Sequence, residues 1–127
     1  MDSILGIHEA ALAFRARRME VLATNLANAD TPRFKARDVE FADVLRNTGL
    51  KPRLEVTARG HIGATDDPRT GPLLYRMPYQ PAADGNTVEA EQELARFAEN
   101  AVAYQATLRF IGGRIATLRM AITGSRA

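Results

Sequence analysis

Apolar residues recur at helical spacing near both ends of the chain, and this spacing is lost between them. Near the N-terminus they return every seven positions, at Leu5, Leu12, Met19 and Leu26. The spacing predicts an amphipathic helix over residues 3–28 whose start is capped by Asp2 or Ser3. A seven-residue repeat also favours a partner helix along its whole length over a globular core.

The C-terminal pattern is longer and more regular. Apolar residues alternate there in steps of three and four, at Leu94, Phe97, Ala101, Tyr104, Leu108, Ile111, Ile115, Leu118 and Ile122. The pattern predicts a helix over residues 86–124, in which Asn86 and Glu89 form a capping box and Gly124 ends the last turn. Gly112 and Gly113 interrupt it, and they indicate either a kink or the close approach of another backbone.

The two apolar seams define the expected architecture. They can pair with each other as a coiled coil, which gives an all-α chain with one long helix at each end. Each seam is too long and too narrow for a monomeric globule of 127 residues, so packing between molecules is favoured. A pair of helices within one chain, with no oligomer, is the alternative.

The first helix is expected to end at a Thr-Pro step. Pro32 has no N–H group, and it disfavours the helical conformation of Thr31. Asp38 is then a plausible cap for a short helix that ends before Gly49. The apolar residues of that short helix are Val39, Phe41, Val44 and Leu45.

The rest of the middle is irregular, with repeated Gly and Pro residues. Apolar and polar residues alternate around Leu54 and Val56, and again from Leu73 to Tyr79. This alternation indicates two short strands, or a β-hairpin. The composition equally fits a loop that becomes ordered only against a neighbour.

Composition narrows the function classes only modestly. The 17 basic and 15 acidic residues give a net charge of +2, which argues only weakly for nucleic acid or an anionic membrane as partner. Cysteine is absent, which excludes disulfides, thiolate metal sites and a cysteine nucleophile. The N-terminus lacks a basic segment followed by an apolar core, so no cleavable signal peptide is predicted. No apolar run approaches the ~20 residues of a membrane span.

The candidate chemical groups favour ordinary structural roles. His8 and His61 are the only histidines, and neither has further metal ligands at close spacing. Asp66 and Asp67 precede Pro68 and are interpreted as a turn, because they lack the oxygen spacing of a calcium loop. No phosphate-binding loop, nucleophile elbow or catalytic carboxylate pair is present. The sequence therefore predicts a protein without enzymatic activity, cofactor, metal or small-molecule substrate.

A basic cluster in the first third of the chain supports one alternative function. Six basic residues surround Phe34: Arg15, Arg17, Arg18, Arg33, Lys35 and Arg37. Such a cluster can follow phosphates and stack a base, but seven acidic residues in the first 46 positions balance it. A small nucleic-acid-binding module and a soluble coiled-coil adaptor or chaperone are therefore the alternatives to a structural, self-assembling subunit.

Residues 25–41 read NLANADTPRFKARDVEF and resemble the N-terminal signature of the bacterial flagellar axial proteins, the rod and hook family. The positions that carry the signature are Asn25, Asn28, Thr31, Pro32, Phe34 and Lys35. The resemblance extends over residues 5–46 and 77–122 and is greatest to the short basal-body rod members. Arg33 stands where the family has glycine. Because a positive φ would strain an arginine, we expect either that the turn differs from that of the family or that the position is not strictly left-handed.

This resemblance implies a structural subunit of the proximal rod that transmits torque. Residues 1–30, 31–85 and 86–124 would form an N-terminal helix, a joint with an irregular middle, and a C-terminal helix of one axial domain. The implied partners are further copies, other rod proteins, and membrane-ring and export-gate components at the rod base. Subunits would stack helically around the export channel in the periplasm, after type III export without a cleavable signal. The signature residues would fix the joint, with Asn25 and Asn28 also available for hydrogen bonds between subunits, and the seam residues would carry helix packing and assembly.

Overall fold

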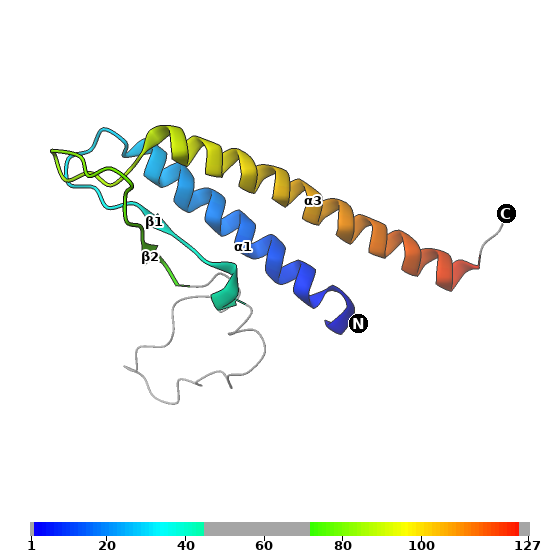
Figure 1. Cartoon of the computed structure of the whole chain (residues 1–127). Helices are drawn as coiled ribbons and strands as arrows, with labels where there is room; N and C mark the ends of the chain where they lie inside the picture. The colour runs from blue at the N-terminus through cyan, green and yellow to red at the C-terminus, as the bar shows by residue number, and fades with distance from the viewer. Residues whose placement is uncertain (1, 45–71, 125–127) are drawn as a thin grey trace, which may run out of the picture.

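Two long helices dominate the structure, which is a computed structural model that describes residues 2–44 and 72–124 (Figure 1). Helix α1 spans Asp2–Ala27 and helix α3 spans Ala90–Thr123. The helices pack side by side and run antiparallel, because Asn25 near the end of α1 contacts Glu93 at the start of α3, whereas Arg15 contacts Asn100. The predicted all-α fold with paired terminal helices is confirmed.

Helix α1 has the predicted bounds, but α3 begins later than predicted. Residues 28–30 form a turn directly after α1. Helix α3 starts at Ala90 rather than at Asn86, and its capping residue is Glu89, without a side-chain capping bond. The predicted capping box is therefore wrong. The Glu89 carboxylate instead accepts hydrogen bonds from the backbone N–H groups of Tyr79 (3.3 Å) and Gln80 (3.2 Å), which holds the chain that precedes the helix.

The C-terminal end of α3 matches the prediction. Gly124 caps it with a φ of 68°, a conformation that favours glycine. Gly112 and Gly113 lie within the continuous helix, and no atom of the described chain, apart from the local helix backbone, lies within 4 Å of the position that a Cβ would occupy. The close approach of another backbone, one of the two interpretations of these glycines, is therefore not found within the part of the chain that the structure describes.

A minimal β-ladder connects the segments that leave and re-enter the helix pair. Strand β1, Arg37–Asp38, pairs antiparallel with β2, Leu74–Tyr75, so that Arg37 lies opposite Tyr75. The extended segment around Leu74 was predicted, whereas β1 as its partner was not. Leu54 and Val56, the other predicted strand, lie outside the described residues. Residues 41–44 are helical, so the short helix is present, but its predicted start is wrong, because Asp38 lies in β1 and Val39 precedes the helix. The remainder of that helix also lies outside the described residues.

The apolar core is small and sits beside α1. Ala10 and Phe14 of α1 pack with Val39 and Val44, and Phe41 lies against this cluster. The Phe14 and Phe41 rings are tilted by 46°, with centroids 5.1 Å apart, which is a favourable arrangement for aromatic rings. The core therefore fixes the segment after β1 onto α1, and the contact between α1 and α3 depends on other residues.

Candidate functional site

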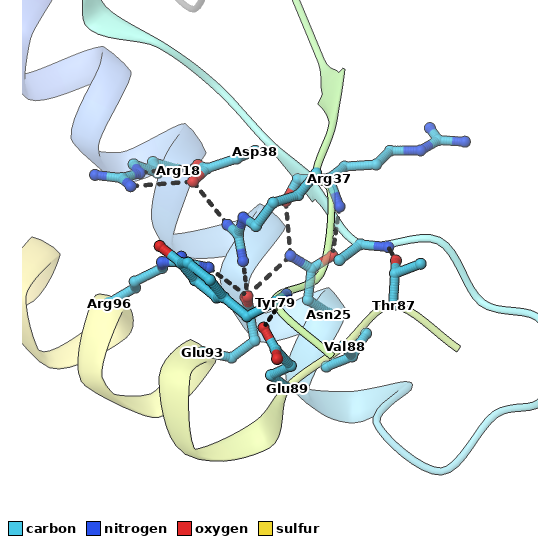
Figure 2. A network of polar contacts seen from close by, with 12 residues as sticks. Arg18, Asn25, Arg37, Asp38, Tyr79, Thr87, Val88, Glu89, Glu93 and Arg96 are labelled. Atoms are coloured by element: carbon cyan, nitrogen blue, oxygen red, sulfur yellow. Dashed lines mark hydrogen bonds and ion pairs between the residues drawn. The ribbon is translucent and has the colours of Figure 1, made fainter. Parts of the chain in front are cut away.

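The joint, which we define as residues 25–38 together with residues 76–93, is held by buried polar side chains. Asn25 is only 1% exposed. Its Nδ2 donates to the Arg37 carbonyl (2.7 Å) and to the Glu93 carboxylate (3.0 Å), and its Oδ1 accepts from the Arg37 N–H at 3.1 Å. One amide thus connects the end of α1, strand β1 and the start of α3 (Figure 2).

Asn28, the second asparagine of the signature, acts locally. Its Nδ2 donates to the Thr24 carbonyl at 2.8 Å, and its Oδ1 accepts from the Thr31 hydroxyl at 3.1 Å. The Thr24 carbonyl belongs to the last turn of α1 and also accepts from the Asn28 N–H at 3.2 Å. Asn28 and Thr31 therefore close the C-terminal end of α1, and Pro32 follows in an exposed position.

Asn86 holds the turn after α1 from the other side. It is 4% exposed, and its Nδ2 lies 2.8–3.1 Å from the carbonyls of Asn28, Ala29 and Thr31. Thr87 continues the contact, because its hydroxyl accepts from the Ala36 N–H at 2.7 Å and its own N–H donates to Phe34. The sequence analysis missed this role, although an Asn-Thr pair just before a helix could serve a neighbouring turn as readily as a cap.

Arg33 adopts the left-handed conformation, with a φ of 62°. The expectation that this position is not strictly left-handed is therefore wrong. A side chain in this conformation costs about 1–2 kcal/mol relative to glycine. The turn is fixed from outside, since the Arg33 N–H donates to the Asp84 carbonyl and the Lys35 ammonium donates to the Gly85 carbonyl at 2.8 Å. Gly85 itself has a φ of 78°.

A cluster of ion pairs connects both helices and both strand segments. Asp38 accepts two hydrogen bonds from Arg18, at 2.9 and 3.0 Å, and a third from Arg76 at 2.7 Å. Arg76 also pairs with Glu93, whose side chain is 1% exposed and which lies 3.4 Å from Arg96. Arg76 therefore bridges two carboxylates from different elements. The sequence analysis did not find this cluster, because most of its pairs join residues that are far apart in the sequence.

The ionisation of this cluster suits a structural role. Burial alone would raise the pKa of Asp38, but hydrogen bonds from Arg18 and from the Val39 N–H outweigh it and hold that pKa below its usual value. The hydrogen bond to Asp38 raises the pKa of Arg18, whereas burial lowers the pKa of Arg76. Asp38 is therefore ionised at neutral pH, and the guanidinium groups also keep their charge. The arrangement therefore stabilises the fixed charges of Asp38, Arg18 and Arg76.

The predicted seams are only partly covered. Half-buried positions are Leu5, Leu12, Met19, Leu26, Phe97, Ala101, Tyr104, Ile111 and Leu118. Exposed positions are Leu94, Leu108, Ile115 and Ile122. The buried residues of α3 are instead polar: Glu93, Asn100 and Thr107. Asn100 donates to the Arg15 carbonyl of α1 at 2.9 Å. The most buried line of α3 is therefore polar, and the apolar seam is half-buried in part and exposed in part.

The described parts of the chain contain neither a candidate metal cluster nor a candidate membrane-spanning helix. Residues 2–44 and 72–124 contain no group of three or more His, Asp or Glu side chains that could hold a metal ion. No helix in these ranges is long and apolar enough to cross a membrane. His8 is half-buried in α1, whereas His61, Asp66 and Asp67 lie outside the described residues.

Comparison with known proteins relates this architecture to a family. Residues 5–35, which include α1 from Leu5 onward and all six signature positions, match the family described as flagella basal body rod protein. The chain is 42% identical to the flagellar basal body rod protein FlgB of Yersinia enterocolitica over 123 residues, which cover 91% of this chain and 90% of that protein. The chain belongs to the FlgB family of flagellar basal body rod proteins.

Further FlgB relatives agree with this assignment. The chain is 42% identical to FlgB of Escherichia coli K12, over 91% of this chain and 89% of that protein. It is 41% identical to FlgB of Aeromonas hydrophila, over 98% of this chain and 96% of that protein. The chain is thus a structural subunit of the flagellar basal-body rod, as the signature predicted, and the nucleic-acid-binding and adaptor alternatives are set aside.

Proposed function

We propose that the chain builds the rod by packing an exposed apolar line of α3 against neighbouring subunits, and that the assembled helices transmit torque. The line consists of Leu94, Leu108, Ile115 and Ile122, which are 58%, 44%, 50% and 84% exposed. The single observation behind the proposal is that these residues lie at multiples of seven positions on a helix whose partner within the chain leaves them uncovered.

The position of the line follows from helix geometry. Glu93, Asn100 and Thr107 are also seven residues apart, and they are buried. One residue along a helix is a rotation of about 100°. The line through Leu94 and Leu108 therefore lies roughly a quarter turn from the line through Glu93, Asn100 and Thr107. Helix α1 cannot cover both lines, and an uncovered apolar line at seven-residue spacing is typical of a surface that receives another helix.

The last turns of α3 strengthen this argument. Helix α3 has 34 residues and α1 has 26, and in Figure 1 the C-terminal part of α3 extends beyond the start of α1. From residue 112 to residue 124, every position except Leu118 is exposed. Ile115 and Ile122 therefore belong to a segment of α3 without a partner in the described chain.

The energy of this contact favours assembly over simple dimerisation. Burying a Leu or Ile side chain completely stabilises by about 1.5–3 kcal/mol. Because these residues are already partly covered, the line contributes roughly 4–6 kcal/mol. The loss of translational and rotational freedom on association costs about 4–15 kcal/mol. One such contact barely holds two subunits together, whereas several contacts made at once hold a subunit in a rod.

The joint supports the mechanical part of the proposal. Asn25, Asp38 and Arg76 fix the strands to both helices through charged and buried hydrogen bonds, so a force on one helix is passed to the other without bending the turn. The helices and the joint thereby act as one axial domain. Its partners are further copies, other rod proteins, and membrane-ring and export-gate components around the export channel, and its place is the periplasmic rod. The role requires no enzymatic activity.

The test replaces exposed residues of α3 in cells that lack the native copy. Ile115→Asp and Leu108→Asp are expected to abolish swimming and to remove rods from isolated basal bodies, while the level and helical content of the chain stay unchanged. Ala116→Asp is the matched control, because Ala116 is an exposed neighbour of Ile115 that points about 100° away from it. This control should swim. Normal swimming of both Asp variants on the apolar line would refute the proposal.

A further inference from the structure

A basic groove runs along α1 on the side of the joint and strand β2. It has a volume of about 610 Å³, and among residues 2–44 and 72–124 Glu20 is the only acidic residue that lines it. Its basic residues are Arg17, Arg33, Lys35 and Arg37. All four are exposed, whereas Val21, which also lines the groove, is buried. The groove therefore combines a strongly positive rim with an apolar floor.

The cations of this groove differ in their partners. Arg17 pairs with Glu20 at 3.0 Å, and Lys35 donates to the Gly85 carbonyl. Arg37 donates to the Tyr75 hydroxyl at 3.3 Å and lies over its ring at 5.1 Å. The guanidinium group of Arg33 has no hydrogen bond or ion pair within residues 2–44 and 72–124. Arg33 thus offers its full charge to a partner outside this part of the chain.

Arg33 combines a strained backbone with a side chain that has no partner within the described residues. Its φ of 62° is a conformation that glycine adopts without strain and arginine does not. The turn itself needs only the backbone of this residue, because its contact with Asp84 is made by the N–H group. An arginine here weakens the turn and gains nothing inside the described chain. Strain of this kind is found where a side chain serves a site.

We propose that this groove is a docking site between subunits, in which Arg33 binds Glu91 in the first turn of α3 of a second copy of the chain. The inference rests on the proposed assembly of the rod. Glu91 is exposed, and its carboxylate forms no hydrogen bond or ion pair with residues 2–44 or 72–124. Leu94, which is 58% exposed, lies one turn further along the same face of α3. This pair of an acid and an apolar residue matches a groove with a basic rim and an apolar floor.

The chemistry and symmetry of this contact suit a rod. Arginine binds a carboxylate with two parallel hydrogen bonds, so it fixes direction as well as position. The groove lies along α1 and its occupant at the start of α3, so two different surfaces of the chain meet. A contact between two different surfaces continues from copy to copy, and it produces an open helical array when the rotation does not close.

Cross-linking tests the position of the partner directly, because the chain contains no cysteine. Chains with Arg33→Cys and chains with Glu91→Cys, each with its own tag, are produced together in cells that lack the native copy. Oxidation of isolated basal bodies should yield a dimer that carries both tags. The matched control replaces Glu91→Cys by Gln92→Cys, which is exposed but points about 100° away. No tagged dimer, or equal yields from both pairs, would overturn the proposal.

Charge exchange tests the energetic role of the contact. Arg33→Glu and Glu91→Arg should each reduce swimming, and the double variant should restore it. Arg33→Gly should raise the melting temperature of the isolated chain by a few degrees, because strain is removed, and should nevertheless reduce the number of rods per cell. A role in the turn alone predicts that Arg33→Gly leaves the number of rods unchanged or raises it. Failure of the double variant to recover would exclude a second copy as the occupant.

These results are separable from the test of the proposed function. If Ile115→Asp abolishes rods while every Arg33 and Glu91 variant swims normally, assembly through α3 stands and docking in the groove is wrong. If single-stranded DNA binds the native chain and Arg33→Glu abolishes that binding, the groove is a nucleic-acid site and the docking proposal is overturned.

Discussion

Replacement of Asn25 by alanine should show how much of the fold depends on one buried amide. The side chain is 1% exposed and makes three hydrogen bonds: two with the Arg37 backbone and one with the Glu93 carboxylate. Asn25→Ala removes all three hydrogen bonds, and water cannot easily replace the amide there, although Glu93 keeps its ion pairs with Arg76 and Arg96. A neutral hydrogen bond contributes about 1 kcal/mol and one to a charged group about 1.5–3 kcal/mol. We therefore expect Asn25→Ala to lower the free energy of unfolding by about 3–5 kcal/mol.

Asn28 provides the matched control, since it belongs to the same signature. It is only half-buried, and its side chain bonds to Thr24 and Thr31, both within four residues. Asn28→Ala should lower the free energy of unfolding by about 0.5–1 kcal/mol. Urea denaturation followed by circular dichroism measures both values. With a slope of about 2 kcal/mol per molar urea, the midpoint should fall by about 1.5–2.5 M for Asn25→Ala and by less than about 0.5 M for Asn28→Ala. Equal shifts for the two variants would refute this account of the joint.

Two further measurements test the charge of Asp38 and the backbone conformation at two glycines. The pKa of Asp38 is lowered in the folded chain. The contribution of Asp38 to stability is therefore complete above the unfolded-state pKa of about 3.9 and is lost as the pH falls through the folded-state pKa. Asp38→Asn should flatten the plot of stability against pH in this acidic range and leave the shape of the plot near neutral pH unchanged. Gly85→Ala should destabilise the chain by about 1–2 kcal/mol, because Gly85 has a positive φ. Gly6 lies in open space within α1, and Gly6→Ala should stabilise the chain by about 0.5–1 kcal/mol. Thermal denaturation gives the sign of both effects, and a higher melting temperature for Gly85→Ala would contradict the left-handed turn.

The long elements could be predicted because their signals are local and repeated. The seven-residue spacing gives both helices to within a few residues, and Gly124 marks the end of α3 as expected. The direction of the apolar lines was harder to predict. The face of α3 against α1 carries Glu93, Asn100 and Thr107, and counting apolar residues cannot identify a polar interface. Each of these polar side chains can be buried because it forms a hydrogen bond.

The joint shows a second limit of local reasoning. Glu93 and Arg76 are separated by many residues from Asn25 and Asp38, and no periodicity pairs them. The strands β1 and β2 have two residues each, too few for an alternating pattern. For Arg33 the sequence left two alternatives, because its φ is determined by the contact with Asp84, 51 positions away. The signature residues lie in the last turn of α1 and in the segment that follows it, and the structure supplies partners that hold this segment.

The long sequence separations within the joint also determine the order in which the chain can fold. The hydrogen bonds of Asn25 to Glu93, of Asn86 to Asn28 and of Thr87 to Ala36 close loops of 68, 58 and 51 residues. Loops of this size form slowly, since their closure costs entropy before any contact stabilises them. The first 85 residues alone contain neither Asn86 nor Glu93. A chain that is released N-terminus first therefore cannot complete the joint until the start of α3 has followed. The C-terminal third of the chain is thus needed to finish folding the N-terminal third.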